Sequence, residues 1–229
     1  IGDRRQRQMC IRDSSNIETE CLYLLGDIVD LWSLKKRLFW PSSHYEVLKK
    51  LNDIASNGTR VVYIPGNHDE TCRDYVGAHW GAIEVREEAV HETAKNKKLL
   101  LIHGDILDHV IRLSRLNRII GDGAYVVLLF LNRWYNFIRR RMGLSYWSLA
   151  SYIKNRVKKA REAIDLYENA AIREAKRRGL DGVVCGHIHQ PEIVSKDGIL
   201  YCNDGDWIEN CTALLEDHQG NLELIHCTE

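Results

Sequence analysis

Four short apolar segments of this sequence each run into a glycine-containing loop whose side chains can bind a metal ion. They are Cys21–Leu25, Arg60–Ile64, Lys98–Ile102 and Gly182–Cys185, and their loops read GD, GNHD, HGD and GHIH. Short apolar runs bounded by glycine and polar residues are typical of buried strands. Because ligand sites in α/β sheets lie beyond the carboxyl ends of the strands, we expect an α/β fold whose strand ends bring these loops to one rim.

The four loops together offer the donors that divalent transition metals prefer, which are imidazole nitrogens, carboxylates and amide oxygens. One histidine at the end of one strand is more often a hydrogen-bonded loop residue, so a single loop of this kind is weak evidence. Four such loops, each following an apolar strand, favour a metal site. The candidate donors are Asp27, Asn67, His68, His103, Asp105, His187 and His189.

These loops resemble the motifs of the calcineurin-like metallophosphoesterase superfamily. Residues 26–30 match its G-D-x-x-D motif, 66–69 its G-N-H-D motif, 103–105 its H-G-D motif and 186–189 its G-H-x-H motif. The resemblance implies a four-layer α/β/β/α sandwich with a helical cap insertion. It also implies hydrolysis of phosphoesters at two divalent metal ions, and manganese is the usual ion of the superfamily members that this chain resembles most.

The resemblance further implies how the donors divide between two ions. The ions would lie about 3.5–4 Å apart, and together they would activate a water and clamp the phosphoryl oxygens. Asp27 would bridge both ions, and His189 would bind the second ion. The other ligands of the first ion would be Asn67, His103 and His187.

His68 resembles the catalytic histidine of the superfamily, which protonates the leaving oxygen or stabilises its charge. Two carboxylates lie close to it in the motifs. We expect Asp69 to orient His68 and Asp30 to support the metal-binding loop from behind. The alternative is that both carboxylates only cap turns.

One motif of the superfamily is missing. The second ion normally takes an Asp and a His from a D-x-H motif on the first strand, and no histidine precedes His44 in this chain. We expect a single metallophosphoesterase domain over residues 1–229, with residues 1–15 foreign to it or disordered. Without D-x-H, we expect one ion to bind well and the second poorly, with impaired catalysis.

Within the superfamily, the chain is most similar to the bacterial UDP-2,3-diacylglucosamine diphosphatases of lipid A synthesis. The resembling segments are residues 23–32, 182–189 and 203–207. Those enzymes cleave the diphosphate of an acylated sugar nucleotide into UMP and a lipid phosphate. This chain departs from the best-known members, which carry arginine where it has His68.

Residues 106–180 are basic, with 16 Lys and Arg residues against 6 Asp and Glu, and we expect them to form the helical cap. Guanidinium groups suit phosphates, and three arginines recur every three residues on one helix flank. These predicted substrate-binding residues are Arg112, Arg115 and Arg118. The apolar run at residues 124–131, flanked by aromatic residues and arginines, fits acyl chains or a membrane surface. The alternative is a cap that packs on the domain, with its arginines in water.

The composition limits the partners. Lys plus Arg equals Asp plus Glu at 32 each, and no basic stripe lies outside the cap, which argues against nucleic acid. Seven cysteines without a CxxC pair fit reduced cytoplasmic thiols. We therefore expect a cytoplasmic enzyme, peripheral on the inner membrane through its cap, that acts on a phosphorylated lipid or nucleotide. The alternatives are a phosphodiesterase or phosphatase of other specificity, or an inactive metal-binding scaffold.

Overall fold

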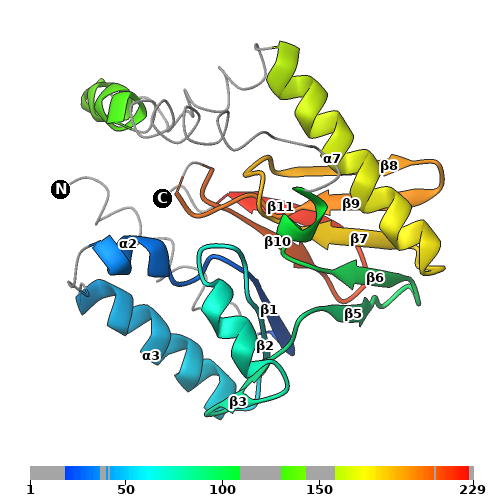
Figure 1. The fold of residues 1–229 in the computed structure, drawn as a ribbon, viewed down its shortest axis with the longest axis horizontal. Coiled ribbons are helices and arrows are strands. Elements are labelled where there is room, and N and C mark those ends of the chain that lie inside the picture. The colour runs from blue at the N-terminus through cyan, green and yellow to red at the C-terminus, as the bar shows by residue number, and fades with distance from the viewer. Residues whose placement is uncertain are drawn as a thin grey trace.

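Figure 1 shows the fold in a computed structural model, which describes residues 19–36, 40, 42–108, 130–142, 158–208 and 210–226. Two mixed β-sheets and a separate β-hairpin make up the strands, and helices lie on the outer sides of the sheets. Two predictions concern residues outside these ranges. They are the foreign or disordered segment 1–15 and the substrate-binding arginines, Arg112, Arg115 and Arg118.

The first sheet has the strand order β1-β2-β4-β3. Its first three strands are parallel, and β3 runs antiparallel to β4. The apolar runs predicted as strands near residues 21 and 60 are confirmed as β1 and β2. The elements of this half are β1 (Cys21–Leu25), α2 (Leu31–Lys36), α3 (Ser42–Ser56), β2 (Arg60–Ile64), η1 (Glu70–Tyr75), β3 (His79–Trp80) and β4 (Ile83–Val85).

The second sheet has the strand order β5-β6-β7-β9-β8, with β6, β7 and β9 parallel and the two edge strands antiparallel to their neighbours. A hairpin of β10 and β11 follows it along the chain. The elements of this half are β5 (Ala89–Glu92), β6 (Lys98–Leu101), η2 (Asp105–Leu107), α7 (Lys158–Arg177), β7 (Gly182–Cys185), β8 (Glu192–Lys196), β9 (Ile199–Asn203), β10 (Thr212–Glu216) and β11 (Leu222–His226).

The core explains the layering. One buried cluster joins the two sheets face to face and includes Leu25 and Val62 from the first sheet and Leu101 and Val184 from the second. Another cluster fills the space between the second sheet and α7. With α3 packed along β2 on the other side, the layers run helix, sheet, sheet, helix. The expected α/β/β/α sandwich is confirmed.

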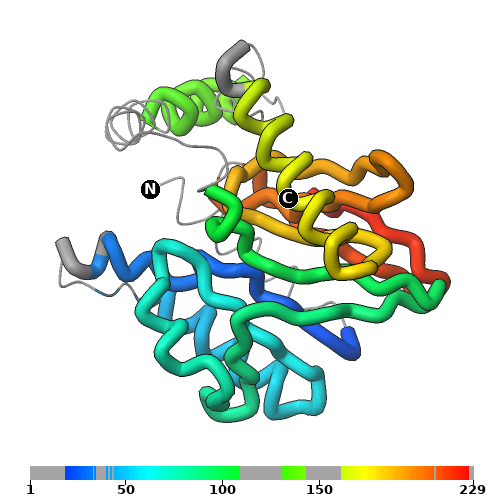
Figure 2. The backbone as a smooth tube through the Cα atoms, turned by 45° about the vertical axis from the view of Figure 1, so that its right-hand side comes forward, coloured from blue at the N-terminus to red at the C-terminus, as the bar shows by residue number. Residues whose placement is uncertain are grey.

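The structure describes residues 106–108, 130–142 and 158–180 of the segment predicted as a cap. α7, its last helix, places Tyr167, Ala171 and Ala175 in the core against the second sheet, so it supports the domain itself. The helix of residues 130–141 instead lies apart from both sheets, as Figures 1 and 2 both show. Among the helices that the structure describes, these two included, none is long and apolar enough to span a bilayer. Whether the whole segment forms a cap stays a prediction.

Candidate active site

The four motif loops meet at the carboxyl ends of β1, β2, β6 and β7 with an unusual backbone. Asp27, His187 and His189 have φ angles of 55°, 65° and 53°, in the left-handed region that most side chains avoid. The loops also approach very closely. A Cβ atom on Gly66 would lie 2.4 Å from Asp27 Oδ1, so only glycine fits there. Strained backbone of this kind clusters at functional sites.

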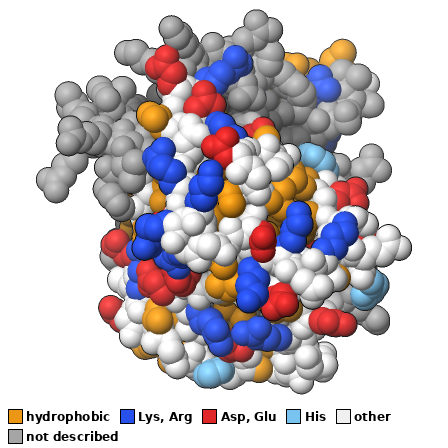
Figure 3. All heavy atoms as spheres, turned by 90° about the vertical axis from the view of Figure 1, so that its right-hand side faces the viewer, with side chains coloured by type: hydrophobic (Ala, Val, Ile, Leu, Met, Phe, Trp, Pro, Cys, Tyr) orange, Lys and Arg blue, Asp and Glu red, His pale blue; other side chains and the backbone are white. Residues whose placement is uncertain are grey.

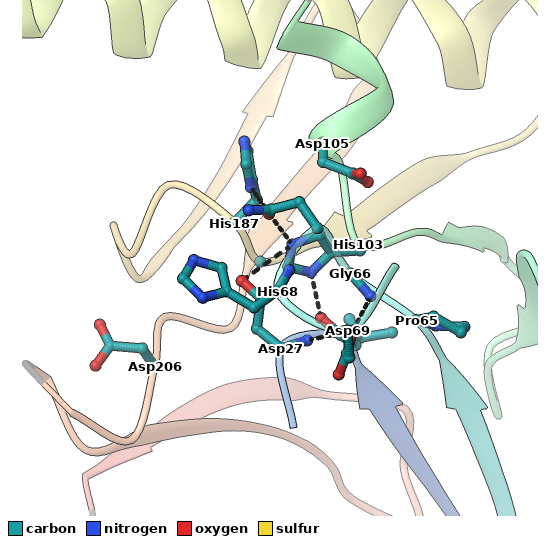
Figure 4. A network of polar contacts seen from close by, with 12 residues as sticks. Asp27, Pro65, Gly66, His68, Asp69, His103, Asp105, His187 and Asp206 are labelled. Carbon is teal, nitrogen blue, oxygen red and sulfur yellow. Dashed lines mark hydrogen bonds and ion pairs between the residues drawn. The ribbon is translucent and has the colours of Figure 1, made fainter. Parts of the chain in front are cut away.

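Four predicted ligands converge at this rim, as Figure 4 shows for Asp27, His103 and His187. Asn67 Oδ1 lies 3.2 Å from His103 Nε2 and 3.0 Å from His187 Nδ1. On the other side, Asp27 Oδ2 lies 3.4 Å from His103 Nε2. The structure therefore brings together the four residues predicted to hold the first ion.

The spacing of these donors fits one divalent ion. Ligand atoms at about 2.1 Å from an ion stand about 3.0 Å apart at octahedral corners and about 3.4 Å apart at tetrahedral corners. The three separations above fall in this range. In the described part of the chain, no three His, Cys, Asp or Glu side chains are grouped tightly enough to hold an ion by themselves. The Asn67 amide oxygen is therefore the donor that links the two imidazoles.

The second nitrogen of each imidazole is held by the protein. His103 Nδ1 donates to the carbonyl oxygen of Leu25 at 2.7 Å, and His187 Nε2 lies 2.9 Å from Asp108 Oδ1. A partner on one ring nitrogen fixes the ring and directs the other nitrogen to the metal. Sequence reasoning missed Asp108, although its position three residues after Asp105 places it within reach of the same loop.

The charges at the rim favour metal binding. Burial raises the pKa of Asp27, but the hydrogen bond and positive charge of His103, together with the backbone N–H of His68, outweigh burial and lower this pKa to about 2. Burial lowers the pKa of His103, but its hydrogen bond to Asp27 and the charge of that carboxylate raise it above its usual value. Asp27 is therefore ionised, as a ligand must be, and a proton taken up by His103 below its raised pKa competes with a metal ion for the ring.

This competition predicts a pH dependence. We expect the affinity for Mn²⁺ to fall about tenfold for each pH unit below the raised pKa of His103, because one proton competes with the ion. Above that pKa, His103 adds no further dependence. Isothermal titration calorimetry in buffers of different ionisation enthalpy measures the proton released. An affinity that stays constant from about pH 5 to pH 8 contradicts the prediction.

His68 lies at the exposed edge of the rim. Its ring stacks on Trp32 with a centroid distance of 4.4 Å and an interplanar angle of 30°, and its Nδ1 lies 3.2 Å from Asp30 Oδ1. Its backbone N–H donates to Asp27 Oδ1 at 2.8 Å, which ties it to the metal ligands. With Nδ1 engaged, Nε2 is the ring nitrogen that can meet a leaving oxygen.

The fold and the ligands can now be compared with known proteins. A family model described as calcineurin-like phosphoesterase matches residues 6–191, most of the chain. The chain belongs to this family. The match begins inside the segment 1–15 that was predicted to be foreign or disordered, and it ends just after the GHIH loop.

Several curated relatives of this phosphoesterase share a name. The UDP-2,3-diacylglucosamine hydrolase of Haemophilus influenzae (strain PittGG) is 24% identical over 212 residues, which cover 91% of this chain and 86% of the relative. The protein of that name from Psychromonas ingrahamii is 28% identical over 215 residues, covering 90% and 83%. Among solved structures, an archaeal phosphodiesterase aligns with 96% of this chain and 91% of its own at 14% identity, with a TM-score of 0.44.

Asp69 of the phosphoesterase has a different role from the one predicted. Its carboxylate is fully buried and accepts hydrogen bonds from Gly66 N at 2.5 Å and Ile28 N at 2.9 Å, with Asp27 N and Val29 N each at 3.3 Å. It therefore joins the loops after β1 and β2. The residue beside the His68 ring is Asp30, so the two carboxylates exchange the roles expected from the sequence.

The predicted ligand of the second ion, His189, has a carboxylate beside one of its ring nitrogens. Its Nδ1 lies 3.4 Å from Asp206 Oδ2, and Asn210 Nδ2 donates to that carboxylate at 2.9 Å. Figure 4 shows Asp206 away from Asp27, His103 and His187. The role of His189 in holding a second ion stays a prediction.

Asp105 was a candidate donor, but it turns away from the ligands in Figure 4. Arg73 Nη2 lies 2.8 Å from both of its carboxylate oxygens and 3.2 Å from the carbonyl oxygen of Pro65. This ion pair fastens the H-G-D loop to the loop after β2. Sequence reasoning missed Arg73, because nothing in the sequence pairs two residues from different loops.

Proposed function

We propose that this protein is a manganese-dependent diphosphatase that cleaves UDP-2,3-diacylglucosamine to UMP and a lipid phosphate. The observation that carries the hydrolytic part is the convergence of Asp27, Asn67, His103 and His187 beside the His68–Asp30 pair. The substrate rests on the curated relatives, which carry that name and align over most of both chains.

Each residue of the rim has a task in this reaction. Divalent ions bound there would polarise the phosphoryl oxygens and lower the pKa of a bound water. His103 and His187 hold their ring nitrogens toward the ion because Leu25 O and Asp108 fix the opposite nitrogens. Water adds to one phosphorus of the diphosphate and releases one proton to the solvent, while the bridging P–O bond breaks. His68 gives a proton from Nε2 to the leaving phosphate oxygen, and Asp30 and Trp32 keep its ring in place.

His68 also favours a second candidate, a phosphodiesterase or phosphatase of other specificity. The best-known diphosphatases of the resembled group carry arginine at this position, whereas this chain carries histidine in a G-N-H-D loop. A histidine can protonate the oxygen of a simple ester, and arginine cannot be deprotonated to do so. The hydrolytic chemistry is common to both candidates, so only the substrate distinguishes them.

The test compares UDP-2,3-diacylglucosamine with bis-p-nitrophenyl phosphate, each with Mn²⁺, with Mg²⁺ and with a chelator. The wild type is expected to release UMP in Mn²⁺ and to prefer the lipid nucleotide. Asn67→Ala serves as the site variant and should abolish both the release and Mn²⁺ binding. Tyr45→Glu serves as the matched control, because Tyr45 lies exposed on α3, outside the site.

Each other result overturns a different part of the proposal. Cleavage of the generic ester alone overturns the lipid assignment and leaves a phosphodiesterase. Binding of Mn²⁺ without turnover of either substrate overturns the catalytic proposal in favour of a metal-binding scaffold. A faster reaction with Mg²⁺ than with Mn²⁺ overturns only the choice of metal.

A further inference from the structure

Helix α7 carries a hydroxyl group into the core, where a phenylalanine ring would fill almost the same space. The outer side of the helix bears charged residues of both signs, and positive and negative side chains also mix over the face of the molecule in Figure 3. Its inner side joins the core cluster against the second sheet through Tyr167, Ala170, Ala171, Ile172 and Ala175. Tyr167 is fully buried, and burying a hydroxyl group costs free energy unless the group has a partner. Apolar packing alone therefore does not explain a tyrosine at this position.

The Tyr167 hydroxyl group lies between two of the loops that carry predicted metal ligands. Its oxygen forms a long hydrogen bond, 3.5 Å, to the carbonyl oxygen of Gly186, the residue before His187. It also lies so close to Gly104, the residue after His103, that a Cβ atom on Gly104 would collide with it. The Tyr167 ring itself lies beside the His187 ring, with a centroid distance of 6.0 Å and an interplanar angle of 31°. One buried hydroxyl group thus touches both the loop after β6 and the loop after β7.

The hydroxyl group acts as a hydrogen-bond donor in this place. Burial raises the pKa of Tyr167 well above its usual value, so the group keeps its proton. The Gly186 carbonyl oxygen also accepts a hydrogen bond from Asn203 Nδ2 at 2.7 Å, and the Asn203 side chain is fully buried as well. A carbonyl oxygen has two lone pairs and can accept from both donors. The loop that carries His187 is therefore held from β9 by Asn203 and from α7 by Tyr167.

We propose that Tyr167 is a positioning residue that sets the spacing of His103 and His187 for a shared metal ion. The centroids of these two rings lie 5.1 Å apart, and both rings meet Asn67 Oδ1. Each ligand is covalently bonded to a glycine that the hydroxyl group touches, so a shift of either loop changes the distance between the two imidazoles. Metal binding senses such a shift, because the distances from an ion to its ligands vary by only about 0.2 Å. The inference rests on the proposed function and deepens it, because it adds to the metal site a residue that is not itself a ligand.

Tyr167→Phe tests this role, because it removes the hydroxyl group and keeps the ring. We expect the Kd for Mn²⁺, measured by isothermal titration calorimetry, to rise about tenfold, as when a group that orients a metal ligand is lost. The matched control is Ile172→Val, which removes one buried methyl group from the same helix and the same core cluster. This control should lower the Tm of the metal-free protein and leave the Kd unchanged, because its packing defect lies away from both loops. Circular dichroism measures Tm and confirms that each variant is folded.

Gly104→Ala supplies a second perturbation of the same contact. Its new methyl group collides with the Tyr167 hydroxyl group, so we expect Mn²⁺ affinity to fall by about 100-fold. Alanine is strained at this φ of 110° whatever its neighbours, so the informative comparison is with the double variant. When Tyr167→Phe is added, the nearest atom to the methyl group is a ring carbon at 3.0 Å. Gly104→Ala/Tyr167→Phe should therefore bind Mn²⁺ about tenfold more tightly than Gly104→Ala alone, although each single change weakens binding.

Several outcomes overturn the proposal. One is an unchanged Kd for Tyr167→Phe, which leaves the residue a purely structural role. Another is an equal rise of Kd in Ile172→Val, because any loss of packing would then have the same effect. A double variant that binds no better than Gly104→Ala alone shows that the hydroxyl group does not set the spacing of the loops. A wild type that binds no Mn²⁺ overturns the proposed function together with this inference, whereas Mn²⁺ binding without hydrolysis counts only against the proposed function.

Discussion

Replacing His68 with glutamine is expected to lower kcat for phosphoester hydrolysis by about 10²–10⁴-fold, while Mn²⁺ affinity stays within about twofold of the wild type. The side chain supplies the proton for the leaving oxygen, so its loss affects the chemical step. The metal ligands remain in place, because His68 contacts Asp27 through its backbone N–H rather than through its ring. Steady-state kinetics at saturating Mn²⁺ and calorimetric titration of the metal measure the two quantities.

Asp108→Asn is the informative comparison for this experiment. The Asp108 side chain holds the ring of His187, a predicted metal ligand, and does not reach the leaving oxygen. It should therefore weaken Mn²⁺ binding by about 10–100-fold and change kcat little once the metal is saturating. If both variants weaken metal binding equally, or if His68→Gln keeps most of its activity, the division of roles between these residues is wrong.

Asp69→Ala is expected to lower the free energy of unfolding by about 3 kcal/mol or more, because it leaves several buried backbone N–H groups without an acceptor. The carboxylate is fully buried and receives N–H groups from both the loop after β1 and the loop after β2. For a chain of this length, the expected fall in Tm is about 6–12 °C. Thermal unfolding of the metal-free protein, followed by circular dichroism, measures it.

The control for that variant is Asp30→Ala. The Asp30 side chain is 49% exposed and contacts the exposed ring of His68, so its removal should change the free energy of unfolding by at most about 0.5 kcal/mol. Equal losses of stability in the two variants would show that Asp69 does not hold the two loops together.

The sequence predicted the apolar strands well and the more polar edge strands poorly. β2, β6 and β7 are continuous apolar runs because parallel strands in the middle of a layered domain are covered on both faces. β1 lies at the edge of the first sheet, but it is an apolar run as well and was also predicted. β5 and β8 lie at the edges of the second sheet, with several half-buried or exposed residues and no apolar run. β3 is two exposed residues long, and only its pairing with β4 defines it.

The residues of the candidate site were likewise predicted only in part. The motifs predicted which residues converge, since each ligand directly follows a strand whose position in the sheet is fixed. They did not predict Asp108, Arg73 or Trp32, whose contacts depend on how separate loops fold against each other. The exchange of roles between Asp30 and Asp69 has the same cause. Each of these aspartates lies only a few residues after the glycine of its motif, so the geometry of the turn decides which carboxylate faces inward.

The left-handed backbone at Asp27, His187 and His189 also restricts how the metal preference of this site could change by mutation. Asp, Asn and His tolerate this conformation better than other residues, and a typical L-residue there costs about 1–2 kcal/mol. Exchanging these predicted ligands for Glu or Cys would therefore strain the loop as well as alter the donor. Asn67 and His103 have no such positive φ, so they are the positions at which a different ligand chemistry can be introduced at the lowest conformational cost.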